Sequence, residues 1–207
     1  MRIGVFGGTF DPVHFGHLIM AEQCREQAAL DQVWFVPSAR PPHKLDQPLT
    51  PFAQRVEMLA LALAGQPAFR VEEIEKDRPG PSYTADTLHN LNRLHPNNDW
   101  FLLVGSDTLS DLPTWHEPAR VVARATLLVV MRPGYAELPV DDLRLSLSLP
   151  KESDLRVQLI QSPLFDISSR DLRRRAAEGR SLRYLLPRSV ECYIQGKSLY
   201  QPKPNEK

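Results

Sequence analysis

Short apolar runs recur along the chain, separated by polar residues, glycine or proline. Such runs are typical of strands that are buried on both faces of a sheet. The sequence therefore predicts six strands, at Arg2–Phe6, Val33–Val36, Phe69–Val71, Trp100–Val104, Thr126–Met131 and Leu155–Ile160.

Apolar residues at helical spacing fill the intervals between these runs. The clearest pattern follows residue 50, where steps of four, three and four positions place the apolar residues on one helix face. Its members are Phe52, Val56, Leu59 and Leu63. We expect Thr50 to cap this helix and Pro51 to occupy its first position. Further helices are expected from about Gly16 to Ala28, at Leu88–Leu94 with Ser82 as a candidate cap, at Arg170–Glu178 closed by Gly179, and from Pro187 to Gln195.

The alternation of strands and helices indicates an α/β fold with a parallel sheet and right-handed crossovers. We expect a single domain over residues 1–195, with a helical C-terminal part from about residue 168 and a polar tail at 196–207. Gly134–Ser153 contains Pro139, Pro150 and mixed charge, which predicts an irregular surface connection.

Composition limits the partners that this chain can attract. The 25 Lys and Arg residues balance 25 Asp and Glu residues, so no general attraction to nucleic acid or to an anionic membrane is expected. Any anion site must therefore be local. No apolar run approaches the ~18 residues of a membrane span. The chain enters a predicted strand without a signal peptide, which makes a cytoplasmic location the default expectation.

The two cysteines, Cys24 and Cys192, are too few for a disulfide scaffold or a zinc cluster. Both lie in stretches that look helical, and we expect them to be buried free thiols.

The segment from Gly7 to His17 leaves the first predicted strand and enters the first predicted helix. Gly7 and Gly8 allow the backbone to approach a ligand closely. A helix that begins near Gly16 presents unpaired N–H groups, which suit a phosphate. The segment matches neither the dinucleotide-binding glycine pattern nor the P-loop, so oxidoreductase and P-loop functions lose support.

His14 and His17 are three positions apart at the start of this helix, a spacing that can aim both rings at one place. Two such rings could donate hydrogen bonds to a phosphate whose charge grows in a transition state. The plainer alternative is a pair of surface or capping histidines. A zinc site is a poor alternative, because no neighbouring Cys, Asp or Glu set completes four ligands.

The run Gly-Gly-Thr-Phe-Asp-Pro-Val-His-Phe-Gly-His resembles the signature of the nucleotidyltransferase superfamily that carries (H/T)-x-G-H. This resemblance implies a Rossmann-like, doubly wound parallel sheet with a small C-terminal helical appendage. It also implies an ATP site, with residues Gly7, Gly8, Thr9, Phe10, His17, Gly105 and Asp107 contributing to it.

Ile167–Arg173 is similar to the C-terminal motif of the same superfamily, I-S-S-T-x-(I/V)-(R/K), with Arg170 in place of the usual threonine. Leu172 is a milder departure. The resemblance implies that Ile167, Ser168, Ser169 and Arg173 belong to the ATP site, where hydroxyls, backbone N–H groups and the guanidinium hold the β- and γ-phosphates. A capped, solvated basic helix is the alternative, and we prefer it for Arg174 and Arg175.

Three further segments resemble the bacterial nicotinate-mononucleotide adenylyltransferases. They are Pro41–Lys44, Ser82–Leu88 and Gly105–Asp107, with Trp115 shortly after. The resemblance implies an acceptor site made by Lys44, Tyr83, Thr84, Ala85, Trp115 and Arg132. Ordinary alternatives exist for each: a surface lysine, helix-capping residues, a core tryptophan and, for Asp107, a turn aspartate.

Together these resemblances imply adenylyl transfer from ATP to nicotinate mononucleotide, giving deamido-NAD and pyrophosphate in NAD biosynthesis. His14, His17 and Arg173 are the expected catalytic residues, and Mg²⁺ is expected to bridge the phosphates without direct protein ligands. The alternatives are transfer to nicotinamide mononucleotide or to phosphopantetheine, a nucleotide sensor without catalysis, and a nucleic-acid-binding module, which the balanced charge disfavours. Oligomeric state is left open.

Overall fold

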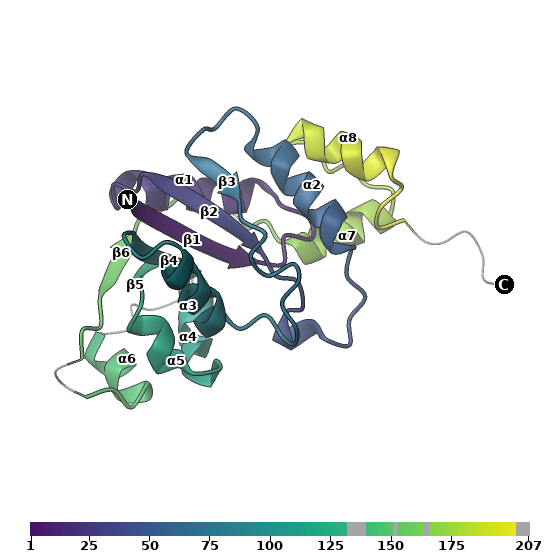
Figure 1. Cartoon of the computed structure of the whole chain (residues 1–207). Helices are drawn as coiled ribbons and strands as arrows, with labels where there is room; N and C mark the ends of the chain where they lie inside the picture. Colours follow the sequence, from purple (N-terminus) through teal and green to yellow (C-terminus); the bar gives the residue numbers. More distant parts are fainter. Residues whose placement is uncertain (132–139, 151–152, 164–165, 202–207) are drawn as a thin grey trace.

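A computed structural model of the chain describes residues 1–131, 140–150, 153–163 and 166–201. Its strands are β1 (Arg2–Gly8), β2 (Gln32–Pro37), β3 (Phe69–Val71), β4 (Asp99–Gly105), β5 (Thr126–Val130) and β6 (Val157–Ile160). They form one sheet in the order β3-β2-β1-β4-β5-β6, with every neighbouring pair parallel (Figure 1). All six strands were predicted, and their ends differ from the prediction by at most two residues.

Alternate residues of the strands face two separate cores. On β1, Phe6 belongs to one buried cluster, whereas Ile3 and Val5 belong to the other. On β4, Phe101 and Leu103 belong to the same cluster as Phe6, and their neighbours along the strand belong to the other cluster. Burial on both faces is the reason why these strands read as continuous apolar runs in the sequence.

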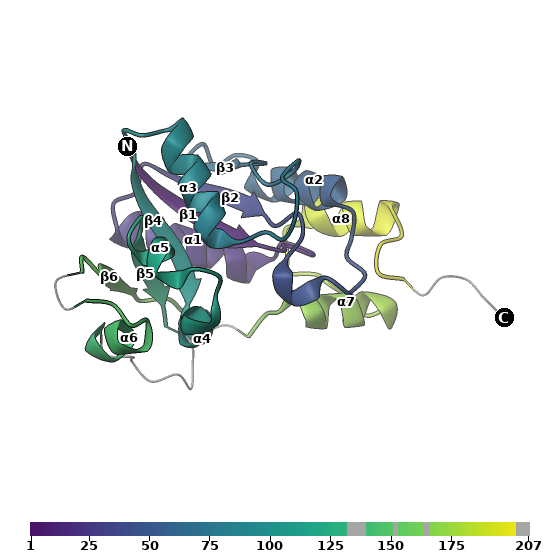
Figure 2. The same ribbon diagram turned by 60° about the horizontal axis from the view of Figure 1, so that its bottom comes forward.

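Helices cover both faces of the sheet (Figures 1 and 2). One buried cluster joins the sheet to α1, α2, α7 and α8, and the other joins it to α3, α4, α5 and α6. The bounds are α1 (Phe15–Gln27), α2 (Phe52–Leu63), α3 (Thr84–Leu94), α4 (Ser106–Asp111), α5 (Pro118–Val122), α6 (Val140–Ser146), α7 (Ser169–Ala177) and α8 (Arg188–Gly196), with 3-10 turns η1 (Pro42–Lys44) and η2 (Leu112–Thr114). The Rossmann-like α/β fold with C-terminal helices is confirmed.

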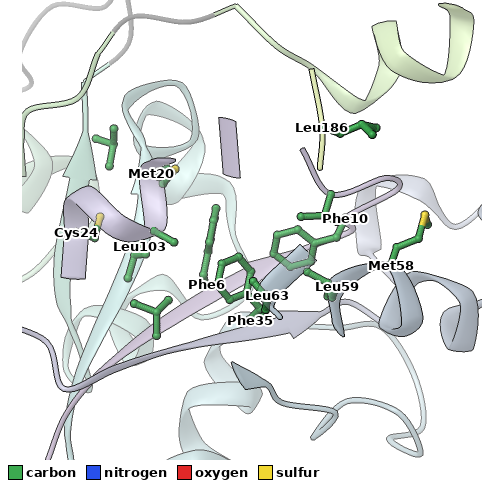
Figure 3. Close-up of a cluster of buried hydrophobic side chains, with 14 of the residues drawn as sticks. Phe6, Phe10, Met20, Cys24, Phe35, Met58, Leu59, Leu63, Leu103 and Leu186 are labelled. Atoms are coloured by element: carbon green, nitrogen blue, oxygen red, sulfur yellow. The ribbon is translucent and has the colours of Figure 1, made fainter. Parts of the chain in front are cut away.

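An aromatic cluster anchors the loop that follows β1. The ring of Phe10 packs against Phe6 and Phe35, with centroids 5.4 and 5.7 Å away, and Met58 and Leu59 of α2 lie beside it (Figure 3). Phe10 is 2% exposed and adopts a positive φ of 49°. Burial of this one side chain fixes the loop between β1 and α1 against the sheet.

Two predicted helix caps were wrong. Pro51 itself is the N-cap of α2, so the helix begins one residue later than predicted and Thr50 lies outside it. Tyr83, not Ser82, is the N-cap of α3. The Ser82 hydroxyl instead accepts a hydrogen bond from the backbone N–H of Arg40. In both places, contacts with the site loops decide the geometry rather than local capping propensity.

Other expectations also need correction. The connection expected at Gly134–Ser153 contains α6, a short helix held by one fully buried residue, Leu143. Cys24 is buried as expected, but Cys192 is exposed, because it lies on the outer face of α8.

The chain does not become a polar tail at residue 196. Gly196 is the last residue of α8, and the apolar side chains of Leu199 and Tyr200 pack against the core. Residues 202–207, also assigned to that tail, lie outside the described part of the chain. No helix within the described residues is both long and apolar enough to cross a lipid bilayer.

Candidate active site

A cleft of about 850 Å³ opens at the carboxyl ends of β1 and β4. The strand order reverses between these two strands, which is where open α/β sheets bind their ligands. The sequence-predicted residues that line the cleft are Gly7, Gly8, Thr9, His14, His17, Lys44, Tyr83, Thr84, Gly105, Trp115 and Ile167. Segments far apart in the sequence, expected to bind two different substrates, thus share one cavity.

Several other predicted residues do not line the cleft. Phe10 and Ala85 have buried side chains, so only their backbone groups can reach a ligand. Ser168 is the N-cap of α7, and Ser169 and Arg173 lie on α7 and contact the loop after β1. Asp107 lies in α4, but its side chain and all of Arg132 are outside the described structure.

Gly7 and Gly8 border different surroundings. A Cβ added at Gly7 meets no heavy atom within 4 Å, because the backbone there borders open space. A Cβ added at Gly8 comes within 3.0 Å of the Phe10 ring. Gly7 therefore leaves room for a ligand, whereas Gly8 leaves room for the aromatic anchor of the loop.

The two histidines of the first motif stand together at the start of α1. His14 is the N-cap residue, and its backbone N–H donates to Nδ1 of His17 over 3.2 Å. Their rings stack with centroids 3.7 Å apart and an interplanar angle of 22°. His17 thus helps to cap the helix, and both rings line the cleft. Capping and phosphate binding are compatible here, because the same helix N-terminus faces the cavity.

The N-terminus of α7 is docked on the loop after β1. Ser168 caps α7 by accepting from the backbone N–H of Asp171 over 3.2 Å. The Ser169 hydroxyl donates to the Pro12 carbonyl over 2.8 Å. One N–H of the Arg173 guanidinium donates to the Asp11 carbonyl over 2.7 Å. Sequence motifs at the two ends of the chain are therefore in direct contact.

The next two arginines of α7 make local contacts. Arg174 pairs with Asp171, and Arg175 donates to the Ser181 carbonyl over 2.9 Å. These contacts agree with the solvated basic face preferred for this pair.

Lys44 brings a cation to the same loop. Its ammonium donates to the Thr9 hydroxyl over 3.0 Å. Burial lowers the pKa of Lys44, and the nearby charge of Arg173 lowers the pKa further. Arg170 acts in the same direction, whereas Asp11 opposes it. Positive charge therefore gathers at this edge of the cleft, which suits a ligand with several negative charges.

A second aromatic pair stands at the start of α3. The ring of Tyr83 stacks on His116 with centroids 4.1 Å apart and an interplanar angle of 27°. Both rings line the cleft, next to the half-buried Trp115. Sequence reasoning missed His116, since a single histidine after a tryptophan carries no spacing signal of its own.

Sequence reasoning also missed Arg55, which lies on α2 and is 1% exposed. Its guanidinium donates to the Thr9 carbonyl over 2.8 Å and to the Thr50 carbonyl over 2.9 Å. Burial lowers the pKa of Arg55, while the charge of Asp11 acts in the opposite direction. The periodicity of α2 places Arg55 between apolar positions, and an arginine among leucines could have been recognised as a buried anchor.

The chain is similar in sequence to known proteins. A family model described as cytidylyltransferase-like matches residues 5–175. A protein of Thermomicrobium roseum named "Probable nicotinate-nucleotide adenylyltransferase" is 47% identical over 200 residues, which are 97% of this chain and 92% of the relative. A protein of Thermus thermophilus with the same name is 47% identical over 201 residues, covering 97% of this chain and 100% of the relative.

Solved structures share the fold. The nicotinic acid mononucleotide adenylyltransferase of Plasmodium falciparum, in complex with NaAD, matches with a TM-score of 0.79 at 20% identity. The match covers 96% of this chain and 97% of that chain. At this identity, the likeness supports the arrangement of sheet and helices and nothing finer.

Proposed function

We propose that this chain transfers the adenylyl group of ATP to nicotinate mononucleotide. The premise is that the chain belongs to the cytidylyltransferase-like family and within it to the nicotinate-nucleotide adenylyltransferases. The products are deamido-NAD and pyrophosphate, and the reaction belongs to NAD biosynthesis. The observation that carries the proposal is the stacked pair of His14 and His17 at a helix N-terminus that borders the cleft.

In the proposed reaction, an oxygen of the acceptor 5′-phosphate forms a bond to the α-phosphorus of ATP. The bond from this phosphorus to the oxygen that bridges the α- and β-phosphates breaks on the side opposite the attack, and pyrophosphate leaves. A phosphate monoester is already ionised near pH 7, since its second pKa is about 6. The chain therefore needs no general base, and its task is positioning and charge neutralisation.

The residues divide between the two substrates in the proposed scheme. His14 and His17 donate to the oxygens of the α-phosphate, while Gly7, Gly8, Thr9, Phe10, Gly105 and Asp107 form the ATP site around them. Ile167, Ser168 and Ser169 present the N-terminus of α7, and Arg173 stabilises the leaving pyrophosphate. Lys44 and Arg132 bind the acceptor phosphate, Trp115 stacks on the pyridine ring, and the backbone of Tyr83, Thr84 and Ala85 receives the nicotinate carboxylate.

The ATP is expected to enter as its Mg²⁺ complex. Within the described residues, no three His, Cys, Asp or Glu side chains are grouped so that they could hold a metal ion. Mg²⁺ usually keeps several waters and binds through substrate phosphates, which is why direct protein ligands are not expected here. A bound ion would neutralise phosphate charge. The cytoplasmic location expected from the sequence stays a prediction.

A panel of acceptors tests the proposal. The protein is incubated with Mg-ATP and, in separate reactions, nicotinate mononucleotide, nicotinamide mononucleotide or phosphopantetheine, and pyrophosphate release is followed. We expect the fastest release with nicotinate mononucleotide and accumulation of the corresponding dinucleotide. Release with phosphopantetheine alone would assign another acceptor, and no release with any acceptor would contradict adenylyl transfer.

A further inference from the structure

Tyr200 connects the C-terminal segment to the loop that bears the histidine pair. Its hydroxyl donates to Oδ1 of Asp11 over 2.6 Å, although the two residues are 189 positions apart. Asp11 is 1% exposed, and Tyr200 packs against the core beyond the end of α8. This contact therefore joins two buried or half-buried groups and is shielded from water.

Three other parts of the chain form hydrogen bonds to this loop at or near Asp11. Its carboxylate accepts from Tyr200 and also from the backbone N–H of Thr50, over 3.2 Å. Its carbonyl accepts from Arg173 of α7. Two residues earlier, the Thr9 carbonyl accepts from the buried Arg55. Segment 9–11 is thus held from α2, from α7 and from the C-terminal segment at once.

The Tyr200 phenol is a fixed donor in this arrangement. Burial raises its pKa, and the negative charge and hydrogen bond of Asp11 raise the pKa further. The phenol therefore keeps its proton throughout the physiological range. A phenylalanine at this position keeps the ring and loses the hydroxyl, with its bond to Asp11 and its contact with the Thr50 side chain.

We propose that Tyr200 is a positioning residue for catalysis, which acts through Asp11 on the loop that carries Thr9 and His14. The inference rests on the proposed adenylyl transfer for its catalytic meaning. His14 and Thr9 border the cleft. If the loop shifts at Asp11, these groups are displaced from the positions in which they would contact the α-phosphate. Groups that act mainly in the transition state affect kcat more than the KM of the acceptor when they are misplaced.

The chain supplies a matched control in Tyr193. Its hydroxyl donates to Oε2 of Glu57 over 2.6 Å. Like the Tyr200–Asp11 contact, this is a tyrosine–carboxylate bond made by the C-terminal region, but its carboxylate lies on α2. Glu57 is not part of the site loop, and neither residue lines the cleft. Tyr193→Phe therefore removes a tyrosine–carboxylate bond of the same length, at a more exposed position, without touching the loop.

The experiment compares Tyr200→Phe, Tyr193→Phe and the wild type. We expect both variants to melt within a few degrees of the wild type. Only Tyr200→Phe should lower kcat, by about tenfold, since displacements of the order of 1 Å can cost up to about 10²-fold. The KM of nicotinate mononucleotide should change less than kcat in Tyr200→Phe, because Lys44 touches the loop only through the Thr9 hydroxyl, whereas Tyr83, Thr84 and Trp115 lie on other segments.

Amide hydrogen exchange gives a readout that needs no activity. We expect faster exchange in a peptide spanning residues 7–17 for Tyr200→Phe and unchanged exchange there for Tyr193→Phe. Equal kcat and equal exchange in the two variants would overturn the positioning role. A wild type that releases no pyrophosphate would overturn the proposed function instead. The exchange comparison would then still test whether Tyr200 holds the loop in place.

Discussion

The guanidinium of Arg173 donates to the backbone carbonyl of Asp11 over 2.7 Å, across 162 positions of sequence. One residue further along that loop, the Pro12 carbonyl accepts from Ser169. The two motifs that sequence reasoning assigned to the ATP site are thus in direct contact. A substitution in the second motif should therefore disturb the first.

Arg173→Ala should weaken the use of ATP more than the use of the acceptor. The variant loses a cation proposed to hold the leaving pyrophosphate and also the bond to Asp11. Initial rates with each substrate varied in turn should show a higher KM for ATP together with a lower kcat. Arg174→Ala is the control, since Arg174 lies next on the same helix and pairs with Asp171. If ATP affinity were unchanged while acceptor affinity fell, the two phosphate sites would be reversed.

His17→Ala should retain the fold and lose most of the turnover. Removal of one preorganised donor to a developing charge costs about 10²–10³ in kcat in comparable sites. The bond that His17 accepts from the N-cap backbone at the start of α1 is lost as well, which should lower the melting temperature slightly. Turnover and thermal unfolding are measured on the same preparations. His89→Ala, on the exposed side of α3, should match the wild type.

A result that would contradict this role for His17 is turnover within a factor of about two of the wild type in a normally folded variant. His17 would then be a capping residue and no more, which was the plainer alternative for this motif.

The strands were predictable because their signal is local. Phe6 and Ile3 lie on opposite faces, and both are buried, so an apolar run is sufficient to locate β1. The helix α6 gave no such signal, since Leu143 is its only fully buried residue and prolines stand on either side of it in the sequence. The cap of α2 was misplaced by one residue for a related reason, because its start depends on contacts made by Thr50.

The site was predictable where a motif keeps its residues close in sequence, as for His14 and His17. It was not predictable where burial brings together distant residues. Tyr200 was assigned to a polar tail, yet its hydroxyl reaches Asp11. Nothing in the residues around position 200 indicates that partner. His116 stacks on Tyr83 from a distant part of the sequence, and no spacing pattern links the two positions.

Acceptor use should fall at alkaline pH through the titration of Lys44. Burial holds the pKa of this lysine below its usual value, and the charge of Arg173 adds to the effect. Since only the protonated amine attracts the acceptor phosphate, kcat/KM for the acceptor should be fully present below this lowered pKa and should decline as pH rises through it. The profile of kcat/KM for the acceptor at saturating Mg-ATP reports this titration in the enzyme–ATP complex, the form that binds the acceptor.

Lys44→Arg separates this effect from other causes of alkaline inactivation. A guanidinium keeps its charge to above about pH 12, so the alkaline decline should disappear from the measured range even if the absolute rate is lower. An identical decline in both proteins would mean that a group other than Lys44 titrates, and that the acceptor phosphate is held elsewhere.

Nicotinate mononucleotide should be preferred over nicotinamide mononucleotide, because the N-terminus of α3 favours an anion. The two acceptors differ by a carboxylate against an amide, and a helix N-terminus stabilises a negative charge by about 0.3–1 kcal/mol when exposed and by more when partly buried. An amide would point its own N–H₂ donors at the N–H donors of the helix. Asp86, the acidic residue in the first turn, lies 3.8 Å from the guanidinium of Arg120, which offsets its charge.

Trp115 would stack on either ring, so Trp115→Phe should lower affinity for both acceptors and leave their ratio unchanged. Specificity constants measured for both acceptors in both proteins decide the matter. Equal constants in the wild type would refute the carboxylate site at α3, and a ratio that collapses only in Trp115→Phe would transfer the discrimination to the tryptophan.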